Sequence, residues 1–198
     1  MREADMEIRE PGLIRMQRAY HQAGHVVADL VCGFRFTAVT IRPEGSAEND
    51  AALYGNVLGR AGDLAVVQLA GVVASSLKTG RDPWDNPDQT DEDRTDIAAA
   101  RIFIDDWTGF LSRTFGESSL KEQVWDDVTK RTRLMVEQNW TAIDVVANVL
   151  QEQETVSYGD IIRILKERCP DSTPGEKSRF PDIFTNGSGG SSPSVGED

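Results

Sequence analysis

Residues 64–77, LAVVQLAGVVASSL, constrain the fold more than any other segment of this sequence. Apolar side chains occur on nearly every side of the segment, so a helix formed here must be buried on most of its faces. A buried strand is the alternative interpretation of so apolar a run. Gly80 follows, a residue that can end a helix in the left-handed conformation. We therefore expect a central helix with other elements packed around it.

Several further segments show the apolar period of amphipathic helices that could cover the central one. The first, residues 13–32, follows Pro11 and Gly12 and ends before Gly33, which would close it in the left-handed conformation. Another begins within the acidic run 91–96, because acidic side chains favour the positive end of a helix dipole. The remaining predicted helices are residues 117–139, residues 141–153 and a shorter helix that starts after Ser157.

Two segments have the alternation and β-branched content of strands. They are FTAVTIRPEG, residues 36–45, and LYGNVLGR, residues 53–60, separated by a polar stretch. The simplest arrangement is a small antiparallel hairpin. The predicted fold class is therefore mainly α with a small β-hairpin or sheet (α+β).

The end of the sequence differs in composition from the rest. From Pro170 onward proline, glycine and serine accumulate, a composition that cannot bury enough apolar surface to fold. We expect one domain over residues 1–169 and a flexible tail over residues 170–198.

The charge balance limits the partners. Lysine and arginine number 21 against 33 aspartates and glutamates, which gives a formal net charge of -12. This charge would repel phosphate backbones and anionic lipid, so nucleic acid is not expected as a partner.

The first ten residues lack the apolar region of a signal peptide, and no run reaches the length of a membrane span. We expect no membrane insertion and a cytoplasmic location, with Cys32 and Cys169 as buried thiols rather than a disulfide framework.

Both histidines of the chain lie in the first predicted helix, within AYHQAGH, residues 19–25. His21 and His25 are four positions apart and share a helix face, so both imidazoles could bind one metal ion. The spacing is that of H-E-x-x-H in zinc peptidases, with Gln22 in the position of the glutamate. From the spacing alone, two surface or core histidines are the alternative.

The sequence around the histidines resembles FtsH-type zinc peptidases, the proteolytic domains of membrane-anchored AAA proteases and their small stand-alone relatives. The segment AYHQAGHVVA is similar to AYHEAGHAVV of that family. Family segments of the types VTIIPRG, LGGRAAEEL, SNDLxxAT and LAEALLEKETLDGEEIREIL follow in the same order along this chain. Their counterparts are VTIRPEG (39–45), LAGVVASSL (69–77), TDIAAARIF (95–103) and VVANVLQEQETVSYGDIIRIL (145–165). The resemblance covers roughly residues 18–166 and implies a zincin-like fold.

The resemblance also implies a set of zinc ligands. His21 and His25 take the two histidine positions, and Asp96 is best placed as the third ligand, with a fourth position left for water. Asp93 and Asp91 are near enough in sequence to compete with Asp96. The alternative for Asp96 is a purely electrostatic role at the start of a helix.

The chain departs from the family at the position of the general base. A carboxamide can orient a water molecule but cannot accept its proton, so Gln22 should lower the rate by about 10²–10⁴-fold or more. Ser75 and Ser76 replace two glutamates of the family, and no phosphate-binding loop of an ATPase is present. Gln22 is either an introduced inactivating change or a natural loss of the base.

Three hypotheses follow. The first is a zinc-dependent metallopeptidase of flexible protein segments, inactive or nearly so with Gln22, whose substrate strand pairs with the edge of the hairpin. The second is a catalytically silent metal-binding scaffold that recognises protein segments. The third is a helical domain without metal.

Gly24 is expected to serve close packing, and Trp84, Trp107, Trp125 and Trp140 to pack the helices.

Overall fold

The computed structural model describes residues 11–42, 60–85, 89–115 and 120–170. These residues form six helices and a two-stranded antiparallel sheet, which confirms the predicted fold class of mainly α with a small sheet. The elements in chain order are α1 (Pro11–Cys32), β1 (Ala38–Thr40), α2 (Ala61–Thr79), α3 (Asp91–Phe115), α4 (Leu120–Gln138), α5 (Trp140–Gln153), β2 (Thr155–Ser157) and α6 (Tyr158–Arg168).

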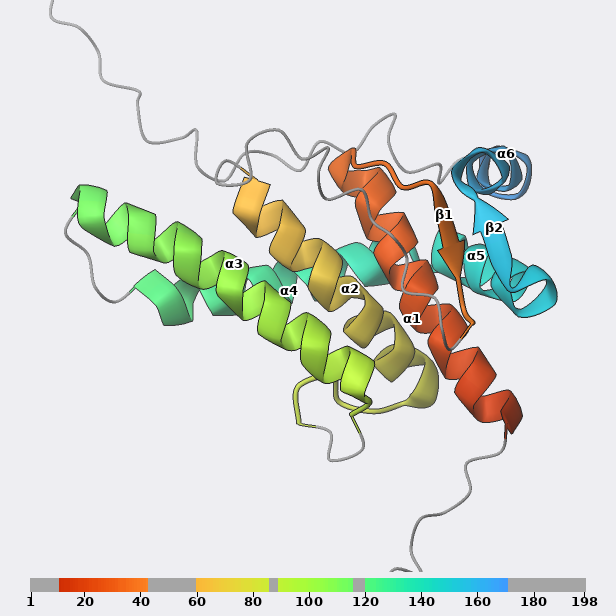
Figure 1. Ribbon diagram of the computed structural model, residues 1–198, viewed down its shortest axis with the longest axis horizontal. Helices are drawn as coiled ribbons and strands as arrows, with labels where there is room; N and C mark the ends of the chain where they lie inside the picture. Colours follow the sequence, from red (N-terminus) through yellow and green to blue (C-terminus); the bar gives the residue numbers. More distant parts are fainter. Residues whose placement is uncertain (1–10, 43–59, 86–88, 116–119, 171–198) are drawn as a thin grey trace, which may run out of the picture.

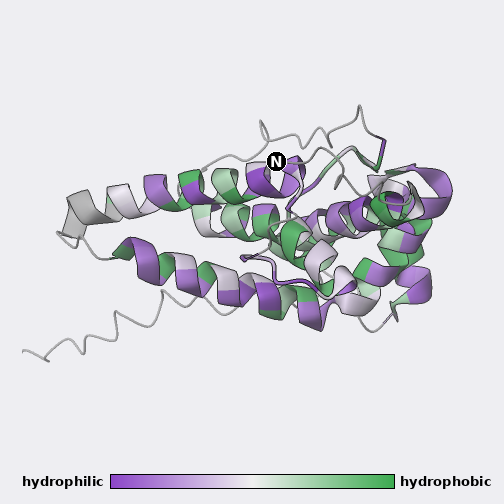
Figure 2. Ribbon diagram, turned by 90° about the horizontal axis from the view of Figure 1, so that it is seen from below, coloured by the Kyte–Doolittle hydropathy of each residue, from purple (hydrophilic) through white to green (hydrophobic). Residues whose placement is uncertain are grey.

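Helix α2 is the central element that the apolar run predicts. Every residue from Leu64 to Ser76 except Gln68 is buried. Helices α1, α3 and α4 pack against α2, and Figure 1 shows α1, α2 and α3 side by side with α4 and α5 behind them. Hydrophobic residues gather where the helices face one another, and hydrophilic ones line the outer sides (Figure 2). The apolar character of α2 thus follows from its contact with three other helices.

One helix in the described part of the chain, α2, is long and apolar enough to cross a membrane. In the fold 72% of this stretch is buried against other helices. Burial in the core is therefore sufficient to explain its composition.

Helices α1 and α2 approach each other closely at glycine. A Cβ atom on Gly24 would lie 2.4 Å from the carbonyl oxygen of Ala70 and 2.9 Å from Cβ of Ala74, too close for any side chain. The prediction that Gly24 serves packing is confirmed. The close approach matters for the site, because it brings α2 against the helix face that carries the histidines.

The ends of α1 and α2 agree with the sequence. Gly33 and Gly80 have φ angles of 73° and 69°, the left-handed conformation that glycine adopts without a steric penalty. The amide of Gly33 donates to the carbonyl of Leu30 at 3.1 Å, and that of Gly80 to Leu77 at 3.3 Å. Both helices therefore end where the sequence predicts.

The sheet differs in its second strand from the predicted hairpin. β1 pairs with β2, in the register Ala38↔Ser157, Val39↔Val156 and Thr40↔Thr155. The predicted strand 53–60 lies outside the described residues except for Arg60, which directly precedes α2. The sequence predicts a small sheet but not this partner, because β2 is only three residues long.

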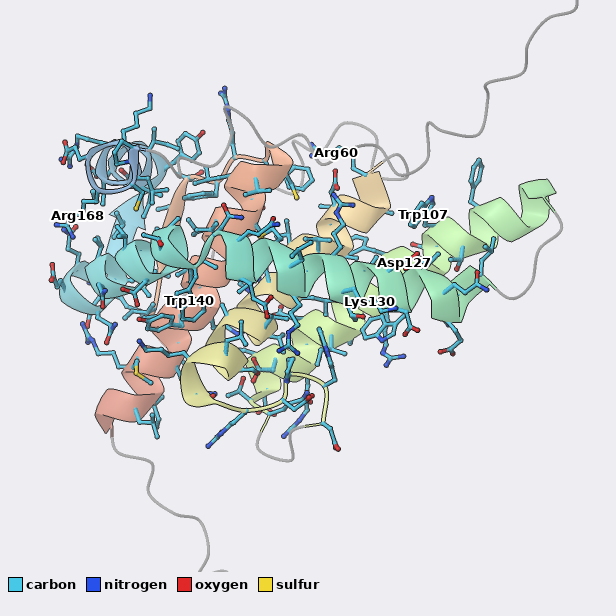
Figure 3. All side chains as sticks on the ribbon, turned by 180° about the vertical axis from the view of Figure 1, so that it is seen from behind. Arg60, Trp107, Asp127, Lys130, Trp140 and Arg168 are labelled. Carbon is cyan, nitrogen blue, oxygen red and sulfur yellow. The ribbon has the colours of Figure 1, made fainter. Side chains whose placement is uncertain are left out.

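Trp107, Trp125 and Trp140 pack against the helical core, as the sequence predicts, whereas Trp84 lies in the segment between α2 and α3 and is 36% exposed. Trp140 stacks on Tyr20 of α1 with ring centroids 5.7 Å apart, and Trp84 meets Trp125 edge to face at 6.1 Å. Figure 3 shows Trp140 at the junction of α4 and α5, beside α1. The predicted flexible tail, apart from Pro170, lies outside the described residues.

Candidate metal centre

The ligand atoms of three predicted site residues meet between α1 and α3. The Nε2 atoms of His21 and His25, one turn apart on α1, are 3.0 Å from each other. Oδ2 of Asp96 from α3 lies 2.9 Å from Nε2 of His21 and 3.2 Å from Nε2 of His25. Two helices therefore direct two nitrogens and one oxygen at a single point.

The spacing of these atoms fits a small metal ion. Zinc bonds of about 2.0–2.1 Å in a tetrahedral arrangement keep ligand atoms about 3.3 Å apart, close to the separations found here. The side chains of His21, His25 and Asp96 are 4%, 14% and 16% exposed, so the group is closed at His21 and reachable from the other two. His21, His25 and Asp96 could hold a metal ion.

The outer nitrogen of His25 fixes the orientation of its ring. Nδ1 lies 2.8 Å from the carbonyl oxygen of Val67 on α2. A carbonyl can only accept, so Nδ1 carries a proton and Nε2 is the nitrogen that could bind a metal ion beside Asp96 and His21. The neighbouring Gly71 leaves room for the ring, since a Cβ atom there would lie 2.4 Å from Nε2.

The outer nitrogen of His21 meets a buried carboxylate. Nδ1 lies 3.1 Å from Oδ1 of Asp93. The other oxygen of Asp93 accepts the backbone N–H of Thr90 at 2.9 Å, and the Thr90 hydroxyl accepts the N–H of Asp93 at 3.0 Å. This reciprocal pair is a capping box at the start of α3.

The two carboxylates dominate the electrostatics of the site. Burial alone would lower the pKa of His21, but hydrogen bonds with Asp93 and Asp96 raise it to about 9. Burial would raise the pKa of both aspartates. For Asp93, hydrogen bonds with His21 and Thr90 outweigh burial and hold the pKa below its usual value. For Asp96, the charge of His25 and hydrogen bonds with both histidines have the same effect. The site thus favours positive charge at the point where the ligand atoms meet.

The other acidic residues considered as ligands lie elsewhere. Asp91 has a side chain that is 98% exposed and pairs with Arg94 at 2.9 Å. Asp93 contacts the outer nitrogen of His21, not the inner one. Of the three candidates, Asp96 is the residue whose carboxylate faces both inner nitrogens.

Gln22 lies on α1 between the two histidines. Its Oε1 atom is buried, and among the described residues it has no hydrogen-bond partner. A buried acceptor without a partner is costly, so Oε1 requires a donor from outside the described residues.

A cavity of about 340 Å³ opens beside His21. It lies between the first half of α1, Ser75 on α2 and the start of α3. Arg18 and Glu92 form an ion pair at 3.2 Å at its side. Ser75 and Ser76 are buried, and the Ser75 hydroxyl donates to the carbonyl of Val72. The cavity is open space next to His21, one of the three residues of the group.

The sequence did not predict the outer partners of the histidines. The spacing of Thr90 and Asp93 is that of a capping box and was a usable signal for the start of α3. No sequence signal points to the Val67 carbonyl, because a backbone atom carries no pattern. No family model and no curated protein matches the chain.

Proposed function

We propose that this protein is a zinc metallopeptidase of the zincin-like, FtsH type whose general base is replaced by Gln22. The observation that carries the proposal is the group of His21, His25 and Asp96, with Gln22 between the histidines. Three ligands from the protein leave a coordination position open, which is typical of catalytic rather than structural zinc sites.

The ligand set favours zinc over calcium and magnesium. Two imidazoles and one carboxylate suit zinc, whereas calcium and magnesium prefer oxygen ligands. When bound, zinc would supply a polarised peptide carbonyl and a more acidic water molecule. His25 and Asp96 are the partly exposed residues of the set, and His21 borders the cavity.

Gln22 supplies an amide where the reaction needs a base. Its oxygen can accept a hydrogen bond and its nitrogen can donate one, but neither takes up a proton near neutral pH. The chain as written would therefore hold a substrate and turn it over about 10²–10⁴-fold more slowly than a form with glutamate.

The substrate class follows from the surface around the site. The cavity beside His21 has room for one side chain of an extended peptide, and β1 has a paired strand on one side only within the described residues. We propose flexible protein segments as substrates, with β1 as an edge to which an extended chain could add. The net charge of -12 opposes nucleic acid as a partner.

The second candidate function is a silent metal-binding scaffold that recognises protein segments. Gln22 is the observation that favours it, because three side chains that could hold a metal ion lie together while the base is missing. Both candidates share the metal and the peptide and differ in whether position 22 ever carries a base.

One substitution separates the two candidates. Gln22→Glu restores a carboxylate of the same size and should produce cleavage of an unfolded protein such as casein, abolished by a zinc chelator. Gln153→Glu adds the same charge at an exposed position of α5 and should leave the protein inactive. A Gln22→Glu protein that holds zinc fully yet cleaves none of a broad set of flexible substrates would favour the scaffold.

A further inference from the structure

We infer that Asp93 is a positioning residue that fixes His21 as an Nε2 ligand of the metal. The inference rests on the metal site of the proposed function but not on peptidase activity. It concerns a residue that the resemblance to the FtsH-type family does not assign, since Asp93 lies before the segment that matches the family.

Both oxygens of Asp93 have a defined partner. Oδ1 contacts Nδ1 of His21 at 3.1 Å, and Oδ2 accepts the Thr90 N–H at 2.9 Å. The Thr90 hydroxyl in turn accepts the Asp93 N–H at 3.0 Å. The carboxylate cannot rotate without losing one of these hydrogen bonds. The loss would be costly because the carboxylate is buried.

The contact with Asp93 determines which nitrogen of His21 faces the metal position. An ionised carboxylate accepts only, so Nδ1 of His21 donates to it. Nε2 is then the nitrogen left to bind a metal ion, and it lies 3.0 Å from Nε2 of His25 and 2.9 Å from Oδ2 of Asp96. A carboxylate on the outer nitrogen also makes the imidazole a more basic ligand.

The start of α3 therefore contacts both sides of one ring. Asp93 and Asp96 are three residues apart and share a face of the helix. Asp93 contacts the outer nitrogen of His21 and Asp96 the inner one. The capping box that starts α3 thus sets the position of the orienting carboxylate, and the same first turns supply a metal ligand.

Zinc and cobalt binding by the full chain tests this role without any activity assay. Asp93→Asn should weaken zinc binding by about 10–100-fold and change the visible absorption of bound Co²⁺. Thr90→Val removes the hydroxyl of the capping box and should weaken binding less, whereas Thr90→Ser should restore it. Asp91→Asn, which changes an exposed acid two residues away, should bind like the parent.

A measurement on the parent protein tests the same role even if a variant fails to fold. Long-range ¹H–¹⁵N spectra of the zinc-loaded chain should show His21 with a proton on Nδ1 and the metal on Nε2. Metal on Nδ1, or Asp93→Asn binding equal to Asp91→Asn, would overturn the inference alone. A parent that binds neither zinc nor cobalt would overturn the proposed metal site and this inference with it.

Discussion

A Cβ atom on Gly71 of α2 would lie 2.4 Å from Nε2 of His25, the nitrogen that faces His21 and Asp96. The distance is far below any normal contact, so even a methyl group must displace the imidazole. Gly71 is therefore part of the candidate metal centre although it has no side chain.

Gly71→Ala should weaken zinc binding on the order of 10-fold or more, because it displaces a ligand ring. Alanine normally stabilises a helix by about 0.5–1 kcal/mol relative to glycine, so a loss here cannot come from helix propensity. Competition with a chelating dye measures the affinity. Gly62→Ala is the matched control on α2, because its Cβ would meet Trp107 at an ordinary 3.6 Å and should leave binding unchanged.

The third ligand is tested by comparing three acids at the start of α3. The chain should bind about one zinc per molecule, and Asp96→Ala should lower that occupancy more than Asp93→Ala, because Asp96 faces both inner nitrogens. Asp91→Ala should match the parent, since the Asp91 side chain is exposed. Elemental analysis after dialysis gives the occupancy. Equal retention in Asp96→Ala and the parent would move the third ligand elsewhere.

The close contact of α1 and α2 gives a prediction about stability. Gly24→Ala should lower the free energy of unfolding by about 1–3 kcal/mol, because the added carbon overlaps the Ala70 carbonyl. Gly109→Ala in α3 has no atom within 4 Å of the new carbon and should be neutral or stabilising. Urea unfolding of the metal-free proteins compares them. Equal urea midpoints for the two variants would contradict this prediction, because they would mean that α1 and α2 can move apart with little loss of stability.

The helices were predictable from the sequence because their signals are local. The apolar run of α2 and the glycines after α1 and α2 act within a few residues, and the structure places these elements as predicted. The pairing of β1 with β2 joins residues such as Thr40 and Thr155, 115 positions apart. Strands of three residues carry too little pattern to specify a partner over that distance.

The candidate site, too, was predictable from the sequence only where its signals are local. The spacing of His21 and His25 follows from one turn of helix, so their convergence was predictable. The choice among Asp91, Asp93 and Asp96 depends on how α3 is rotated about its axis, which only the packed structure fixes. The sequence resemblance selected Asp96, and the geometry places its carboxylate between the histidines.

Asp29 is a buried carboxyl group that neither the fold nor the candidate site explains. It lies one turn after His25 on α1, and its Oδ1 has no hydrogen-bond partner among the described residues. Burial raises its pKa from 3.8 to about 7, while the charge of His25 opposes the rise. The unfolded chain therefore releases this proton near pH 4, whereas the folded protein retains it to about pH 7.

This difference makes Asp29 cost stability as the pH rises. Below about pH 4 both states hold the proton and Asp29 costs nothing; the cost grows between pH 4 and 7 and is constant above. The rise of the Asp29 pKa from 3.8 to about 7 corresponds to a loss of roughly 4 kcal/mol in the free energy of unfolding, as an upper value. Asp29→Asn cannot ionise, so its stability relative to the metal-free parent should rise from pH 4 to 7 and level off, measured by urea unfolding with chelator present. Asp127→Asn, on the outer side of α4 (Figure 3), removes an exposed acid as the control. Curves for Asp29→Asn and the parent that run parallel from pH 4 to 8 would show that Asp29 is ionised within the fold, with a partner that offsets its burial.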